Sequence, residues 1–191
     1  MKKKITALLV ILAIMAAVPL FSNLKSIKFP EEKPKNLTQA EIITRTAANN
    51  FRKHYCRETL KALVLILNSN YKAGAFDKND MIKKSDFIKK FKKGKDYYSI
   101  IENTVKKTGD ECISYKGKAA SIPYFKVSKG YTNSSKKYPY LKACACPWDT
   151  RKKDCKNSEN TVGVSINTLD KLCAMGLDCK TALRHFIDAR Y

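Results

Sequence analysis

The sequence predicts an α+β fold, in which helices of a single domain pack on a small, mostly antiparallel sheet, preceded by one N-terminal transmembrane helix. Three observations support this class. Apolar residues repeat with helical spacing up to Gly109, and short strands and turns follow it. An apolar run of 17 residues, Ile5 to Phe21, follows a cap of lysines. The rest of the 191-residue chain is long enough for one domain with a substantial core.

The apolar run divides the chain into three segments. Residues 1–22 are interpreted as an uncleaved signal anchor, because the run does not end in small residues and no lipid-attachment cysteine follows it; a cleaved signal peptide is the alternative. The lysine cap favours a cytoplasmic N-terminus, which predicts a single-pass protein of the cell membrane with its domain on the extracytoplasmic side. Residues 23–36 contain two prolines and no periodicity and are expected to be a linker. Residues 37–191 are expected to form the domain.

Four helices are expected before Gly109. Thr38 and Glu41 have the spacing of a capping box at the start of the first. The second is apolar on nearly all faces, which is typical of a central helix. The fourth ends at Gly109. The four helices are expected at about 38–50, 57–71, 87–91 and 97–107.

Short strands and turns are expected beyond Gly109. Cys112 to Tyr115 and Ala119 to Phe125 are predicted to pair as a hairpin around a turn that contains Gly117. The remaining elements are expected to be a hydroxyl-rich loop at 127–139, a strand at 141–146, a basic loop at 150–160, a strand at 163–165, and two helices separated at Gly176.

The formal charge of +21 predicts attraction to polyanions; a lysine-rich solvated surface is the alternative. Lysine far outnumbers arginine, whereas arginine is the residue that reads bases and phosphates in bidentate fashion. Nucleic acid is therefore not expected as a partner. A cationic interaction protein would instead bind wall polyanions through the lysine-rich stretches 83–95 and 136–156.

Seven cysteines in an exported chain permit up to three disulfides with one thiol left over. A metal site at Cys144, Cys146 and Cys155 is a weak alternative. The spacing differs from Cys-x-x-Cys, and His54 and His185 are the only histidines of the sequence. We therefore expect no cofactor and no metal.

Several short motifs follow one another along residues 37–188. They are Glu58-Thr59-Leu60-Lys61-Ala62, Tyr115-Lys116-Gly117-Lys118, Ser128-x-Gly130-x-Thr132, Pro147-Trp148-Asp149, Gly163-Val164-Ser165 and Leu183-Arg184-His185-Phe186. In order and spacing this series resembles the stage II sporulation protein D family, the SpoIID/LytB-like domain. Members of that family are membrane-anchored lytic transglycosylases that act on the glycan strands of peptidoglycan.

The resemblance implies a groove that binds these glycan strands. The catalytic Glu of the family falls on Asn50, an amide that cannot donate a proton at neutral pH. Four polar positions of the family's site fall on Leu63, Asn68, Lys126 and Ile166. Enzymatic activity is therefore left open. The residues expected to bind the glycan are Asn50, Ser128, Gly130, Thr132, Trp148, Asp149, Gly163 and Ser165.

Three functions follow as expectations. The first is an exported, membrane-anchored and sporulation-related protein of cell-wall remodelling, which binds peptidoglycan glycan strands or a wall-remodelling protein with impaired catalysis. The second is an active lytic transglycosylase with a displaced acid, for which Glu41 and Glu58 are the candidates. The third is a cationic protein that binds wall polyanions on a retained scaffold.

Overall fold

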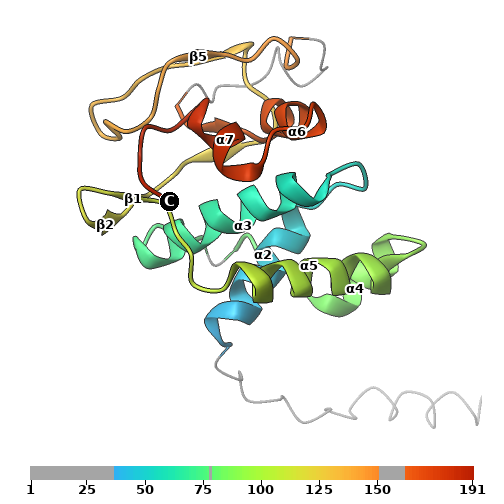
Figure 1. Cartoon of the computed structure of the whole chain (residues 1–191). Helices are drawn as coiled ribbons and strands as arrows, with labels where there is room; N and C mark the ends of the chain where they lie inside the picture. Colours follow the sequence, from blue (N-terminus) through green and yellow to red (C-terminus); the bar gives the residue numbers. More distant parts are fainter. Residues whose placement is uncertain (1–36, 78, 151–161) are drawn as a thin grey trace, which may run out of the picture. The chain divides into compact units, whose positions relative to one another are not determined.

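The computed structural model describes residues 37–77, 79–150 and 162–191, and the central element of this part is helix α3 (Arg57–Lys72). Eleven of its 16 residues are buried. Figure 1 shows α3 between α2 and α5 on one side and α6 and α7 on the other. The prediction of a central helix is confirmed. The surrounding helices are α2 (Gln39–Asn50), α5 (Gly94–Thr108), α6 (Ile166–Ala174) and α7 (Cys179–Arg184).

All four helices predicted before Gly109 are present, and α4 and α5 each begin three residues earlier than predicted. In the capping box of α2, the Glu41 amide donates to Thr38 Oγ1 at 3.3 Å, and the Thr38 amide donates to Glu41 Oε2 at 2.9 Å. Helix α4 (Lys84–Lys90) is short, and α5 ends at Gly109, which has a φ of 57°.

An aromatic cluster fixes the chain where α2 ends and therefore holds Asn50 in place. Phe51, the residue after α2, contacts Phe87 of α4 and Phe91 at ring-centroid distances of 5.9 and 6.0 Å. It also contacts Tyr97 of α5 at 5.3 Å. Such ring contacts contribute about 0.5–1.5 kcal/mol each beyond the area that they bury.

The strands are shorter than predicted. The predicted hairpin around Gly117 is confirmed by the antiparallel pairing of Ser114 with Ala119, whereas the sheet as a whole differs from the prediction. In the part of the chain that the structure describes, they form three separate two-stranded sheets in place of one. The prediction of a single sheet beneath the helices is therefore wrong, whereas the α+β class is confirmed. The antiparallel pairs are β1 (Ser114–Tyr115) with β2 (Lys118–Ala119) and β4 (Tyr131–Thr132) with β5 (Cys144–Ala145), and the parallel pair is β3 (Tyr124–Phe125) with β6 (Val164–Ser165).

The predicted strand from Ala119 to Phe125 is interrupted at 120–123, where the Ile122 amide donates to Asn70 Oδ1 of α3 and Pro123 has no amide hydrogen for a ladder. Its first residue pairs with β1 and its last two with β6. The Val164 amide donates to the Pro123 carbonyl at 2.9 Å. Gly163 lies against this carbonyl with a φ of 131°, and a Cβ atom there would overlap it. The pairing of β3 with β6 therefore requires glycine at this position.

The predicted fold class also includes an N-terminal transmembrane helix, which the described part of the chain does not bear out. Across the described residues, no helix combines the length and the apolar character needed to cross a membrane. Even α3, with 16 residues, is shorter than the roughly 20 that span a bilayer. The segments 1–22 and 23–36, to which the anchor and the linker were assigned, lie outside the described residues, as do 151–161 of the basic loop.

Candidate functional site

A pocket of about 470 Å³ lies at the C-terminal end of α2. Asn50, Lys126 and Ile166, three positions on which the resemblance places functional side chains of the family, all line it. They come from three segments that are distant in the sequence. The complete lining is Asn50, Tyr55, Asp77, Asn79, Asp80, Tyr124, Phe125, Lys126 and Ile166.

The carboxylate of Asp80 is the centre of the polar contacts in this pocket. Its Oδ2 accepts hydrogen bonds from the Asn50 amide group at 2.8 Å and from the Tyr124 hydroxyl at 2.7 Å. Its Oδ1 accepts one from the Asn49 amide group at 2.7 Å. All three neighbours donate, so the geometry suits a carboxylate that acts only as an acceptor.

Tyr124 keeps its proton in this arrangement. Burial raises the pKa of its hydroxyl above the usual value, and the hydrogen bond to Asp80 raises that pKa further. The phenol therefore donates to the carboxylate over the physiological range. Tyr124 belongs to β3, so the parallel pairing with β6 sets its place in the pocket.

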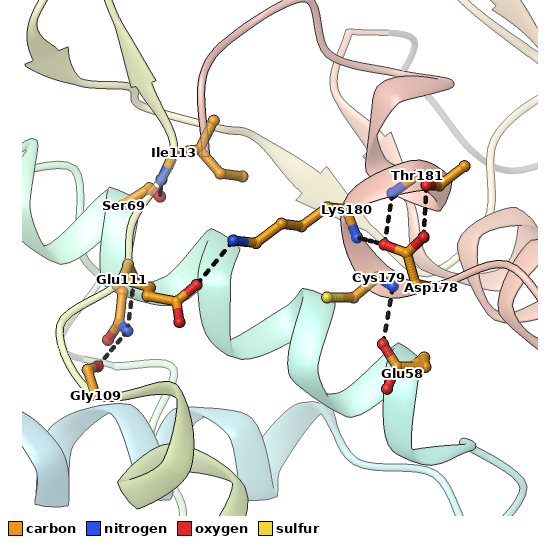
Figure 2. A network of polar contacts seen from close by, with 10 residues as sticks. Glu58, Ser69, Gly109, Glu111, Ile113, Asp178, Cys179, Lys180 and Thr181 are labelled. Atoms are coloured by element: carbon orange, nitrogen blue, oxygen red, sulfur yellow. Dashed lines mark hydrogen bonds and ion pairs between the residues drawn. The ribbon is translucent and has the colours of Figure 1, made fainter.

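The two predicted candidates for a displaced acid lie elsewhere. Figure 2 shows Glu58, in the first turn of α3, next to the start of α7, where its Oε2 accepts a hydrogen bond from the Cys179 amide at 2.9 Å. Glu41 belongs to the capping box, about 14 Å along α2 from Asn50. Neither residue lines the described pocket. Asp80 was not among the site residues predicted from the sequence. The signal available was a pair of acids, Asp77 and Asp80, in an otherwise lysine-rich stretch.

Ser128, Asp149 and Ser165 come together as a group, but inside the protein. All three are completely buried. Asp149 Oδ2 accepts hydrogen bonds from the Ser128 amide at 2.7 Å, the Ser128 hydroxyl at 2.6 Å and the Ser165 hydroxyl at 2.7 Å. Its Oδ1 accepts from Asn167 Nδ2 at 2.8 Å and from Thr168 Oγ1 at 3.1 Å. The Asp149 carboxylate therefore joins three segments by hydrogen bonds, and it is buried away from any ligand.

The other residues predicted to bind glycan surround this group. Gly130 donates its amide to Ser128 Oγ at 3.1 Å, and the buried Thr132 donates its hydroxyl to the Lys142 carbonyl at 3.1 Å. Trp148 is half-buried, and Gly163 lies against Pro123. None of these four is among the described residues that line the pocket at Asn50. The structure thus separates Asn50 from the rest of the predicted set.

A second, basic pocket of about 390 Å³ adjoins the first. The two share Asn50 and Lys126 in their linings. The basic side chains that line the second pocket are Arg52, Lys53, Lys90 and Lys126, together with His54. Together the two pockets offer a ligand acidic acceptors on one side of Asn50 and cations on the other.

Cys144 and Cys146 flank Ala145, and the Ala145 carbonyl lies 3.0 Å from His185 Nε2. The hydrogen bond to Cys146, and next the one to His185, lower the pKa of the Cys144 thiol. The bond to Cys144 and then burial raise the pKa of Cys146. The pKa of His185 is raised, chiefly by its hydrogen bond to Cys144. Cys144 is therefore the thiol that ionises first.

Within the ranges that the structure covers, the cysteines carry free thiols; these are Cys56, Cys112, Cys144, Cys146, Cys173 and Cys179. No group of three or more His, Cys, Asp or Glu side chains in those ranges is placed to hold a metal ion. Cys155, the third member of the weak metal candidate, lies outside the described residues.

We expect Asp149→Asn to lower the free energy of unfolding by about 2–4 kcal/mol, because the new amide group would face hydroxyl and amide donors and leave them unpaired. Urea denaturation measures the change. The control is Asp188→Asn, which alters an exposed carboxylate and should stay within about 0.5 kcal/mol of the wild type. Equal stability of the two variants would contradict the role given to Asp149.

We expect iodoacetamide to alkylate Cys144 at about pH 6, well below the usual cysteine pKa of about 8.5, because the lowered pKa keeps its thiolate populated. His185→Asn removes one of the hydrogen bonds that lower this pKa and should slow the reaction. Peptide mass mapping measures the rate of alkylation at Cys144, and alkylation of Cys112 in the same protein is the internal control. An unchanged Cys144 rate in the variant would refute the link to His185.

A scan against protein-family models finds no family that matches the chain, and a search of curated proteins finds no significant match. The resemblance to the sporulation family stays a prediction from the motifs.

Proposed function

We propose that the pocket at Asn50 binds peptidoglycan glycan strands, and that the protein serves cell-wall remodelling outside the cytoplasm with impaired catalysis. The observation that carries the proposal is the contact of the Asp80 carboxylate with Asn50 and Tyr124 inside a pocket of about 470 Å³. The order of the motifs supports the choice of ligand. Because the motifs resemble those of a sporulation family, the proposal also includes a role in sporulation and a protein partner in wall remodelling.

The pocket has the mixture of surfaces that a sugar requires. The rings of Tyr55 and Tyr124, which are partly exposed, offer apolar faces to the carbon skeleton, and a few polar groups fix its orientation. Asp80 is only partly buried, and its Oδ1 accepts a hydrogen bond from Asn49. A carboxylate oxygen has two acceptor sites, so Oδ1 can also accept a sugar hydroxyl in a charge-assisted hydrogen bond.

The same contacts explain why cleavage would be impaired. Lytic cleavage needs a carboxylic acid that protonates the leaving oxygen. Asn50 has no such proton to give. Asp80 is surrounded by three donors and therefore serves as an acceptor in this arrangement.

Glycan cleavage with Asp80 as the displaced acid is a second candidate. One observation favours it. The carboxylate lies 2.8 Å from the amide of Asn50, the position that the resemblance gives to the catalytic Glu. A substrate that displaced the amide donors would leave Asp80 free to take up a proton and pass it to the glycosidic oxygen.

Calorimetric titration of the full chain with a soluble oligosaccharide of denuded glycan tests the proposal. We expect Asp80→Asn to weaken binding about tenfold or more, because a charged acceptor is lost and each tenfold corresponds to about 1.4 kcal/mol. Asp188→Asn makes the same charge change on an exposed residue outside the pocket and should leave the affinity within about twofold. Equal losses in the two variants would rule out glycan binding at Asp80.

Mass spectrometry of the same mixtures separates the two candidates. The binding function predicts that the oligosaccharide is recovered intact. Release of products with anhydro ends by the wild type, lost in Asp80→Asn and retained in Glu41→Gln and Glu58→Gln, would instead establish the second candidate.

A further inference from the structure

A larger cavity, of about 750 Å³, lies at the C-terminal end of α3. Three segments meet there: the last turn of α3, the β1–β2 hairpin with the residues after it, and the loop that precedes Leu141. Among the described lining residues, three are lysines and none is acidic. The lining is Lys72, Ala73, Ala75, Lys118, Ala119, Ser121, Lys137, Tyr138 and Tyr140.

The three lysines are exposed and keep their charges available. The ion pairs that the described residues form involve other side chains. Lys72 donates one proton to the Asp110 carbonyl at 2.6 Å, which leaves its charge unpaired and two further donors. Lys137 Nζ lies 5.2 Å from the ring centroid of Tyr138. The cavity therefore presents three cations from three segments.

A cluster of tyrosines forms one wall of the cavity and is held rigid. Tyr140 packs between Tyr115 at 5.2 Å and Tyr138 at 6.3 Å, measured between ring centroids. Its hydroxyl donates to the Ser121 carbonyl. Tyr140 is buried and its neighbours are half-buried, and Tyr138 and Tyr140 are the two tyrosines that line the cavity.

We propose that this cavity binds an anionic glycopolymer, a chain of sugar or polyol units joined by phosphodiesters. Lysine carries a compact charge that attracts phosphate without requiring bidentate geometry, and cations on three sides match negative charges that recur along a polymer. The tyrosine wall provides apolar contact for the polyol or sugar carbons. The site is separate from the pocket at Asn50, with which it shares no lining residue in the described ranges.

Single-stranded nucleic acid fits the same cavity less well. Its bases need exposed aromatic faces for stacking. The planes of Tyr138 and Tyr140 are inclined by 63°, and Tyr140 is buried against its neighbours. The rings therefore offer no open platform on which a base can stack.

The test is calorimetric titration of the full chain with soluble poly(glycerol phosphate). The triple variant Lys72→Gln, Lys118→Gln, Lys137→Gln should bind about tenfold or more weakly. The matched triple Lys106→Gln, Lys107→Gln, Lys171→Gln removes the same charge from exposed lysines outside the cavity and should lose less than about threefold. Asp80→Asn, which should weaken glycan binding, should leave the affinity for poly(glycerol phosphate) unchanged. Failure of this proposal can therefore be told apart from failure of glycan binding.

Equal weakening of the two triple variants would overturn the proposal, because binding would then follow net charge alone. The second criterion uses a single-stranded oligonucleotide of equal charge. The proposal would be overturned if the oligonucleotide bound the wild type more tightly than the polymer does, and if the cavity variant lost that affinity. Thermal unfolding checks that the variants fold. If the triple variant does not fold, Lys118→Glu in the β1–β2 hairpin replaces it and is compared with Lys106→Glu on α5 under the same two criteria.

Discussion

The buried carboxylate of Asp149 is the contact on which the second half of the fold depends. Strands of two residues supply few ladder hydrogen bonds, so the segments after Gly109 need another source of cohesion. Five donors converge on Asp149 from the loop at Ser128 and from the start of α6. A buried carboxylate is costly unless it is hydrogen-bonded in this way, and its removal would free these segments from one another.

This contact also shapes the pocket at Asn50. Lys126 precedes Ser128 by two residues, and Ile166 directly follows Ser165. Asp149 holds both serines in the interior, and the Asn167 amide donates to the Lys126 carbonyl at 3.1 Å. Lys126 and Ile166 are thereby fixed in the wall of the pocket. The hydroxyl groups predicted to touch a ligand instead position the residues that line the site.

The helices could be predicted from the sequence because their signals are local. The apolar spacing of α3 and the Thr38–Glu41 cap lie within a few turns of chain. The parallel pairing of β3 with β6 could not be predicted, because it joins residues 40 positions apart through strands of two residues. Asp80 was missed for the same reason, since its partners Asn50 and Tyr124 are 30 and 44 positions away. Ser128 and Ser165 were expected at a surface because nothing local shows that a buried acid would bind them.

The central claim is that a glycan binds at the pocket of Asn50 and Asp80, and not at the hydroxyl-rich loop. Chemical-shift mapping of the ¹⁵N-labelled protein during titration with a denuded glycan oligosaccharide tests it most directly. The account predicts the largest amide shifts at Asn50, Asp80 and Lys126. Shifts confined to Gly130 and Trp148, with the pocket unaffected, would contradict it.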